Sequence, residues 1–275
     1  SILLIMRINI VYKSMEFFTF MVLLYSLISA LLVSLIAVVV ALPFFIKKEV
    51  SKKFILFLLS LSVGVLLSTV FVDFLPEAVS HGYTLGLAIA ILLGFLVMFI
   101  VEKVLHHHHE LKSKKRPVGH GHTYSLGPMV LTGEIIHNFI DGLVIAGSYA
   151  TNITLGITAT ISIIFHELPQ EIADFGVLVY AGYSKKRALF YNFITGITAI
   201  FGVLMGTYFS SNFGWFNEYI IPFAAGNFIY IAAANLVPEL HRKCSLKESI
   251  LDVVGLILGI ALIIIITIYG PSHGH

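Results

Sequence analysis

One apolar stretch of the sequence contains a cluster of side chains that could bind a cation. Residues 165–174 read FHELPQEIAD, and their polar side chains are His166, Glu167, Gln170, Glu171 and Asp174. On a helix, His166, Gln170 and Asp174 share one face, and the two glutamates lie on an adjoining one. Because a charged group at bilayer depth costs a few kcal/mol, such residues usually mark the path of an ion or substrate. The stretch therefore predicts a functional polar face, with a purely structural polar patch as the weaker alternative.

Pro169 lies inside the same stretch. Proline has no N–H group, so it cannot donate to the carbonyl of Phe165 one turn earlier. The sequence predicts a helix kink at this point and a free backbone oxygen at the level of the polar cluster.

A second polar set lies on the preceding apolar stretch. Its members follow one helical face at positions i, i+3, i+4 and i+7, and they are Glu134, His137, Asn138 and Asp141. A short connection joins the two stretches, which predicts an antiparallel helical hairpin with its turn centred just after Ile153. Residues equidistant from that centre lie at one depth. Asp141 is therefore expected level with His166, and His137 level with Gln170.

The two expected layers lie about 6 Å apart, because four residues of helix rise about 1.5 Å each. That spacing leaves room for one metal ion in each layer or for a bridged pair. Between Pro117 and Ser184 the sequence has no Lys or Arg, although it places five carboxylates there: Glu134, Asp141, Glu167, Glu171 and Asp174. Buried carboxylates without a fixed cation must be protonated or neutralised by something that binds.

The available ligand types indicate which cation would bind. Imidazole, carboxylate and amide groups together suit Zn²⁺, Fe²⁺, Mn²⁺ or Cd²⁺. Cys244 is the single cysteine, so no thiolate cluster can form a tight trap for a soft metal. Histidines that carry protons are the alternative, but two sets of imidazole and carboxylate at matched depth favour a metal.

The rest of the chain is predicted to be an all-α integral membrane protein. Of its 275 residues 58% are hydrophobic and 12% charged, and its mean hydropathy is +0.95. Apolar runs long enough to span a bilayer predict eight transmembrane helices, near residues 17–46, 54–79, 83–105, 127–150, 154–183, 187–210, 217–240 and 249–270. Residues 1–16 form an N-terminal extension without a cleavage motif, residues 17–270 the membrane domain, and residues 271–275 a tail.

Basic residues indicate the orientation of these helices. All Lys and Arg except Arg7 and Lys13 lie on or beside alternate connections, beginning with the one between the first two predicted helices. The positive-inside rule makes those connections cytoplasmic, so both termini are expected outside, in the plasma membrane.

Two short segments resemble each other. Asp73 begins DFLPE near the end of the second predicted helix, and Asn235 begins NLVPE near the end of the seventh. In the expected topology they run in opposite directions, which predicts an inverted repeat of helices 1–3 and 6–8 around the hairpin of helices 4 and 5. Asp73 and Asn235 are expected to flank the metal path, and a chance similarity of two Pro-Glu pairs is the alternative.

Histidines also cluster outside the apolar runs. The connection predicted at residues 106–125 is expected on the cytoplasmic side and contains His106, His107, His108, His109, His120 and His122. Clustered imidazoles bind zinc loosely, so the connection predicts a metal buffer, with a solvated loop of no function as the alternative.

The two polar sets resemble the signatures of a known family. HNFIDG at His137–Gly142 and HELPQE at His166–Glu171 are similar to the fourth- and fifth-helix motifs of the ZIP (Zrt/Irt-like) divalent-metal transporters. The resemblance implies an eight-helix fold, and it implies a binuclear metal centre formed by His137, Asn138, Asp141, His166, Glu167 and Gln170. Many relatives have a second histidine where this chain has Gln170. Secondary candidates for metal contact are Glu134, Glu171, Asp73 and Asn235.

The inverted repeat favours a carrier, and no enzymatic activity is expected. The resemblance implies zinc import into the cytoplasm, and the ligand types allow Fe²⁺, Mn²⁺ and Cd²⁺ as further substrates. The expected partners are these ions, the lipid bilayer and a second copy of the chain in a homodimer, with no nucleic acid.

Two other functions compete with metal import. His166-Glu167-x-x-Gln170 is one residue short of the HExxH motif of zinc proteases, which leaves an intramembrane zinc metalloprotease as one alternative. The missing second histidine and the unused set on the preceding helix argue against it. A metal exporter or a metal channel is the other alternative.

Overall fold

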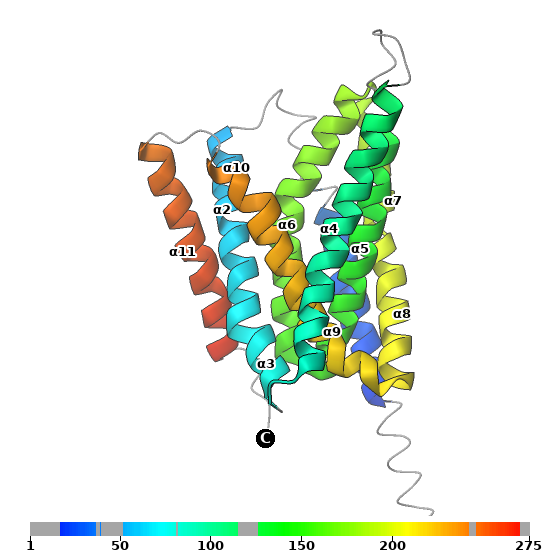
Figure 1. Cartoon of the computed structure of the whole chain (residues 1–275), viewed down its shortest axis with the longest axis vertical. Coiled ribbons are helices and arrows are strands. Elements are labelled where there is room, and N and C mark those ends of the chain that lie inside the picture. The colour runs from blue at the N-terminus through cyan, green and yellow to red at the C-terminus, as the bar shows by residue number, and fades with distance from the viewer. Residues whose placement is uncertain are drawn as a thin grey trace, which may run out of the picture.

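The protein is a bundle of helices in the computed structural model, which describes residues 17–36, 39, 52–80, 82–114, 126–241 and 246–269 (Figure 1). The first helix is Phe17–Ile36. The long helices that follow are α2 (Lys52–Ser68), α4 (Leu85–Lys114), α5 (Leu126–Thr151), α6 (Ile153–Tyr180), α7 (Lys185–Gly196), α8 (Thr198–Asn212), α9 (Gly214–Tyr230) and α11 (Leu246–Tyr269). Short elements continue two of them: the π-helices η1 (Thr69–Phe74) and η3 (Ile231–Leu236), each followed by one α-helical turn or slightly more, α3 (Leu75–Val79) and α10 (Val237–His241).

Within the described residues, six helical segments are long and apolar enough to cross a membrane. They are Phe17–Ile36, Leu56–Val79, Leu85–Val104, Val130–Thr151, Lys185–Asn212 and Ser249–Tyr269. This confirms the prediction of an all-α membrane protein. Helices α6 and α9 are not among the six, and in α6 the polar residues from His166 to Asp174 interrupt the apolar character. The count of eight crossings stays a prediction.

Helix α4 is longer than the sequence predicts. It continues to Lys114, so the expectation that His106–His109 lie in a connecting loop is wrong, and their backbone is helical. No Gly or Pro lies between Gly94 and Pro117, and the Leu, Lys and Glu residues of that stretch are good helix formers. The side chains of His106–His109 lie outside the described residues. So do His120, His122, the extension 1–16 and the tail 271–275.

Glycines let two pairs of helices approach closely. Helix α2 packs against α11 at one edge of the bundle, and α4 packs against α9 (Figure 1). A Cβ atom on Gly226 of α9 would lie 1.8 Å from the carbonyl oxygen of Ile91, and one on Gly64 of α2 would lie 2.2 Å from that of Leu256. Small residues at such crossings allow backbones to meet. Both pairs therefore depend on the absence of a side chain.

The two π-helices occupy matching places: each continues a long helix, η1 after α2 and η3 after α9. Asp73 in η1 and Asn235 in η3 each stand one residue before the end of the π-helix and three before a proline. The Asp73 side chain is buried, and its Oδ1 accepts a hydrogen bond from the Thr267 hydroxyl of α11 at 2.7 Å. The Asn235 side chain lies outside the described residues. Such π-helical turns are frequent at functional sites.

The backbone oxygen that Pro169 leaves free has a partner. The Ser62 hydroxyl of α2 donates to the carbonyl oxygen of Phe165 at 2.5 Å. A second hydroxyl contact, between Thr69 and Ser162, joins η1, which continues α2, to α6. The predicted free carbonyl is confirmed, and α6 is one helix across the proline, so the kink stays a prediction. These contacts hold α6 against α2 beside its polar face.

We expect Gly226→Ala to destabilise the fold by about 1–3 kcal/mol or more, because the new methyl group meets the backbone of Ile91 and overpacks the α4–α9 crossing. The matched control is Gly176→Ala in α6, where a Cβ atom meets nothing within 4 Å. That substitution should be neutral or stabilise by about 0.5–1 kcal/mol. Thermal unfolding of the purified protein in detergent measures both, and equal midpoints for Gly226→Ala and the parent would contradict the packing argument.

Candidate metal centre

A tight turn at Asn152 sets the register of the α5–α6 hairpin. Helix α5 ends at Thr151 and α6 begins at Ile153. The Asn152 side chain caps α6, because its Oδ1 accepts a hydrogen bond from the Leu155 N–H at 2.6 Å. The turn is therefore centred at Asn152, earlier in the chain than the predicted centre just after Ile153. The sequence did contain a signal for this turn, because asparagine is a preferred N-cap residue and Asn152 directly precedes the apolar residues of α6.

This shift changes which side chains face each other. His137 contacts Glu167, with 3.1 Å between His137 Nε2 and Glu167 Oε1. Gln170 contacts Glu134, with 2.7 Å between Gln170 Nε2 and Glu134 Oε1. The prediction that His137 lies level with Gln170 is therefore wrong by about one helical turn.

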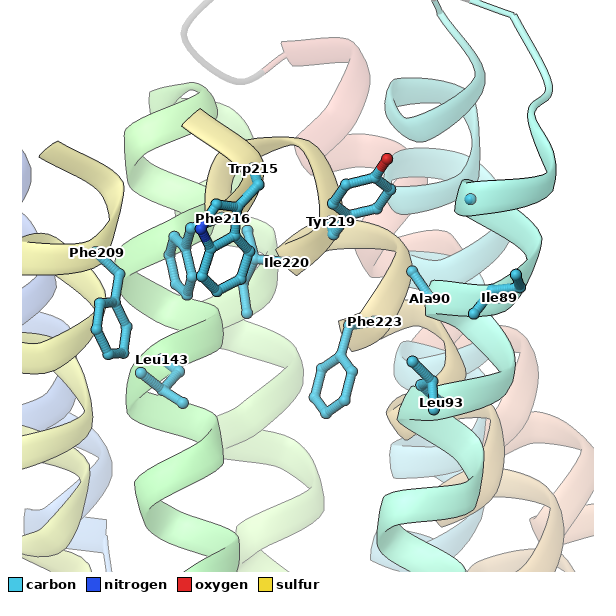
Figure 2. A pocket seen from close by; sticks show the side chains of 11 residues that line it. Ile89, Ala90, Leu93, Leu143, Phe209, Trp215, Phe216, Tyr219, Ile220 and Phe223 are labelled. Atoms are coloured by element: carbon cyan, nitrogen blue, oxygen red, sulfur yellow. The ribbon is translucent and has the colours of Figure 1, made fainter. Parts of the chain in front are cut away.

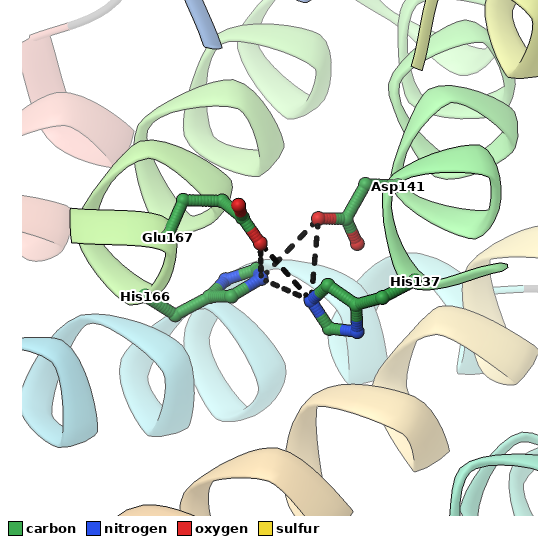
Figure 3. Close-up of side chains that lie close together, drawn as sticks. All are labelled: His137, Asp141, His166 and Glu167. Carbon is green, nitrogen blue, oxygen red and sulfur yellow. Dashed lines mark hydrogen bonds and ion pairs between the residues drawn. The ribbon is translucent and has the colours of Figure 1, made fainter. Parts of the chain in front are cut away.

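Four side chains from the two helices converge on one point (Figure 3). They are His137 and Asp141 of α5 and His166 and Glu167 of α6, and none is more than 4% exposed. His166 Nε2 lies 3.1 Å from His137 Nε2 and 3.3 Å from Asp141 Oδ2. The predicted proximity of Asp141 and His166 is confirmed. The remaining distances are 3.7 Å from His137 to Asp141 and 3.6 Å from His166 to Glu167.

These distances match the edges of a small coordination polyhedron. A tetrahedral zinc site with bonds of about 2.0–2.1 Å has ligand atoms about 3.3–3.4 Å apart. The five distances above run from 3.1 to 3.7 Å. The four atoms therefore have the spacing of ligands around a single ion. Little movement would be needed to coordinate it.

Hydrogen bonding prepares His166 for metal coordination. Its Nδ1 lies 3.0 Å from the carbonyl oxygen of Ser162, which can only accept. Nδ1 therefore carries the proton, and Nε2 presents its lone pair to the cluster. The ring also packs edge-on against Phe228 of α9, with 5.7 Å between ring centroids. The helical spacing of Ser162 and His166 was readable in the sequence, whereas the contact with Phe228 depends on tertiary packing.

Several oxygen atoms around this point lack a hydrogen-bond donor. Both carboxylate oxygens of Asp141, Glu167 Oε1 and Asn138 Oδ1 are buried without a hydrogen-bond partner. The ion pairs of the cluster involve only the two imidazoles. Buried polar atoms are normally satisfied, so these oxygens are suited to a cation.

A second group consists of carboxylates alone. One oxygen from each of Glu134, Glu167 and Glu171 lies within 4.8 Å of the others, and all three side chains are buried. Asn138 and Gln170 both direct their amide nitrogens at Glu134. Glu167 belongs to both groups, so the two groups are adjacent. The secondary candidates Glu134 and Glu171 lie together, whereas Asp73 belongs to neither group.

An apolar cavity of about 520 Å³ lies elsewhere in the bundle (Figure 2). Leu143 of α5 and Phe209 of α8 line one side, Leu93 of α4 lines the other, and Trp215 and Phe223 of α9 lie between them. Its lining contains no carboxylate or imidazole. This cavity is therefore no candidate for a cation site.

Comparison with known proteins agrees with the motifs. Residues 20–128 and 121–267 match the family described as ZIP Zinc transporter. The human zinc transporter ZIP10 is 32% identical over 183 residues, which are 59% of this chain and 22% of that protein. The Drosophila melanogaster zinc transporter foi is 34% identical over 142 residues, 51% of this chain and 20% of that protein. The Mus musculus zinc transporter SLC39A7 is 37% identical over 151 residues, 51% of this chain and 31% of that protein.

The matched segments thus span between about a fifth and a third of these relatives. The two family matches, by contrast, cover most of this chain from the first helix to the last. On that coverage, the chain belongs to the ZIP zinc transporter family.

Proposed function

We propose that the chain carries divalent transition-metal ions, zinc foremost, across a membrane. His137, Asp141, His166 and Glu167 hold the ion in transit. The convergence of their four buried ligand atoms at tetrahedral spacing carries this proposal. The relatives are named as zinc transporters, which supports zinc as the substrate. Fe²⁺, Mn²⁺ and Cd²⁺ suit the same mixture of nitrogen and oxygen ligands.

Amide oxygens complete the proposed site with weaker ligands. Asn138 and Gln170 use their nitrogens as donors to Glu134, which leaves one oxygen on each free to face an ion. Asn138 Oδ1 is buried without a partner. A site without thiolates, completed by amides, binds a metal less tightly than a cysteine cluster does. Easier release is what a carrier needs.

Duplicated contacts support an inverted repeat. The approach of Gly226 to Ile91 in the α4–α9 pair matches the approach of Gly64 to Leu256 in the α2–α11 pair. The same two helix pairs show a second match. In α4–α9, Gly94 approaches the Phe223 carbonyl oxygen, and in α2–α11, Gly259 approaches the Leu61 carbonyl oxygen. The matching π-helices η1 and η3 add to this pattern. Such repeats commonly underlie alternating access, so a carrier is favoured over a channel.

The direction proposed is import into the cytoplasm across the plasma membrane, with eight crossings and both termini outside. The family resemblance and the distribution of Lys and Arg support it. A cavity of about 450 Å³ lies at the α5–α6 turn end of the bundle, and Glu77, Asn217 and Glu218 are among its lining residues. In this topology it opens on the outer face, where its carboxylates would attract cations.

The ligand arrangement argues against a protease. A catalytic zinc keeps one coordination position open for water. Here four protein ligands surround one point, and the second imidazole comes from His137 on α5 rather than from position 170 of an HExxH helix. The arrangement fits binding of an ion better than hydrolysis of a peptide.

We expect Asp141→Asn and His166→Ala each to lower zinc uptake at least about tenfold, since each removes a ligand of the proposed site. Asp141→Asn should fold, because it removes one buried charge and keeps the side-chain shape, and His166→Ala is compared with the parent at equal protein content in the membrane. Uptake of radioactive zinc into proteoliposomes of known orientation measures the effect and the direction of transport. Asp252→Asn in α11 is the matched control and should transport like the parent. Full uptake by Asp141→Asn or His166→Ala, at equal protein content, would exclude that residue from the site.

Gln170→His should tighten zinc binding, because an imidazole is a stronger zinc ligand than an amide oxygen. If release limits the cycle, the same change should slow turnover. Zinc affinity by calorimetry and initial uptake rate are both compared with those of the parent. Identical affinities would show that Gln170 is not a ligand. The site would then consist of His137, Asn138, Asp141, His166 and Glu167.

A further inference from the structure

The apolar cavity between α4, α5, α8 and α9 opens at the surface of the bundle. Its volume of about 520 Å³ lies within the range of about 300–1,000 Å³ that is typical of pockets for small molecules. Three of its lining side chains, Ile89, Leu93 and Trp215, are 46%, 48% and 57% exposed. Cavities with apolar linings stay dry, because they offer water too few hydrogen bonds. The cavity therefore suits an apolar ligand.

Tight packing on either side keeps the cavity from closing. A Cβ atom on Gly94 of α4 would lie 1.9 Å from the Phe223 carbonyl oxygen of α9. One on Gly142 of α5 would lie 2.1 Å from the Ala199 carbonyl oxygen of α8. Each pair of helices thus meets at its backbones, and the cavity lies between the two pairs (Figure 2). No one of these helices can move into the cavity without its partner.

The cavity lies at one end of the membrane-crossing segments. Gly86 is in the first turn of the segment Leu85–Val104, and Phe209 is in the last turn of the segment Lys185–Asn212. Both residues line the cavity. The cavity therefore begins near one membrane–water interface and lies within the apolar part of the bundle.

The lining changes character along this direction. Figure 2 shows Trp215 and Tyr219 at one end of the cavity, and Leu93 and Phe223 at the other. Trp and Tyr are enriched at membrane–water interfaces, where the ring lies against lipid and the polar tip faces the headgroups. A lipid acyl chain enters the bilayer in the same direction, from a polar end to an apolar one.

An acidic cavity adjoins the end marked by Tyr219. Tyr219 lines both cavities, and Glu77 and Glu218 line the acidic one. The Tyr219 hydroxyl lies within hydrogen-bond reach of the Glu218 carboxylate, which ties that carboxylate to the mouth of the apolar cavity. None of the described lining residues of the acidic cavity is Lys or Arg. Its charge is complementary to a positively charged group.

We propose that the apolar cavity binds one acyl chain of a phospholipid with an amine headgroup, of the phosphatidylethanolamine type. The chain packs against Leu93 and Phe223. The Trp215 N–H is a donor for the ester or phosphate oxygens, and the ammonium group faces Glu218. An anionic headgroup without an amine would instead add negative charge beside two glutamates. This site is separate from the candidate metal centre and does not rest on the proposed function.

Fluorescence of Trp215 tests the proposal, because Trp215 is the only tryptophan of the chain. The purified full-length chain in detergent is titrated with phosphatidylethanolamine that has bromine atoms on its acyl chain, since bromine quenches tryptophan fluorescence on contact. We expect the quenching to saturate at one lipid per chain, with the bound lipid counted by native mass spectrometry. Brominated phosphatidylglycerol, which lacks the amine, should bind about two- to fivefold more weakly.

Filling the cavity distinguishes a bound chain from contact with bulk lipid. Ala90→Phe places a ring in the cavity and should weaken binding at least about tenfold, because the ring displaces several buried methylene groups of the lipid. Leu92→Phe is the matched control on the same helix. Leu92 is 67% exposed and is not a lining residue, so this variant should bind like the parent. Glu218→Gln should narrow the difference between the two lipids.

Quenching that never saturates, or equal lipid affinity in a folded Ala90→Phe and the parent, would overturn the site. So would a dimer in which Trp215 is shielded from brominated lipid, since a second copy of the chain would then fill the cavity. Equal binding of the two lipids by the parent would contradict the amine headgroup. Thermal unfolding in detergent checks the fold of Ala90→Phe against that of Leu92→Phe. If Ala90→Phe does not fold, the stoichiometry and the lipid preference of the parent decide by themselves.

Discussion

The structure depends on one electrostatic constraint, which is the burial of several carboxylates where no lysine or arginine can neutralise them. Asp141 and Glu167 are at most 1% exposed, and among the described residues their ion-pair partners are imidazoles. Burying an uncompensated charge is costly, and pairing it with a fixed cation would make the site permanently neutral. A site that must accept and release a divalent ion needs this intermediate state. The polar faces of α5 and α6 therefore turn toward each other inside the bundle.

The surrounding helices hold that pair of faces together. Hydroxyl groups of α2 and η1 and the ring of Phe228 on α9 contact α6 beside the centre, and α5 packs against α6, α8 and α9. Glycine crossings bring α2 to α11 and α4 to α9 at backbone contact distance. These pairs form a close-packed frame around a polar seam. Rigid packing outside and unsatisfied oxygens inside are thus complementary features of one bundle.

The sequence predicted the helices and the residues of the seam better than the contacts between them. Ionisable groups in apolar surroundings identified His137, Asp141, His166 and Glu167, because such residues are rarely tolerated without a function. The missing N–H of Pro169 predicted the free Phe165 carbonyl, since that effect is local. The hairpin register failed because it depends on where one turn is centred, and an error of one or two residues there moves every facing pair by almost a helical turn. The contact of the Phe228 ring with His166 had no local signal, because it arises from packing between distant segments.

The contact between Ser62 and Phe165 bears on how α6 can slide. The Ser62 hydroxyl has two acceptors within reach, the Phe165 carbonyl of α6 at 2.5 Å and the Leu58 carbonyl of its own helix at 2.7 Å. If α6 shifted along α2, the Ser62 hydroxyl would still donate its hydrogen bond to the Leu58 carbonyl oxygen, so this donor would keep an acceptor. In this contact the Phe165 oxygen alone would lose its partner, and a single net hydrogen bond is worth about 0.5–1.5 kcal/mol. That is comparable with thermal energy. Pro169 frees a backbone oxygen beside the candidate metal centre, and the hydrogen bond to that oxygen helps to define the position of α6 against α2. Breaking this one hydrogen bond would cost little free energy.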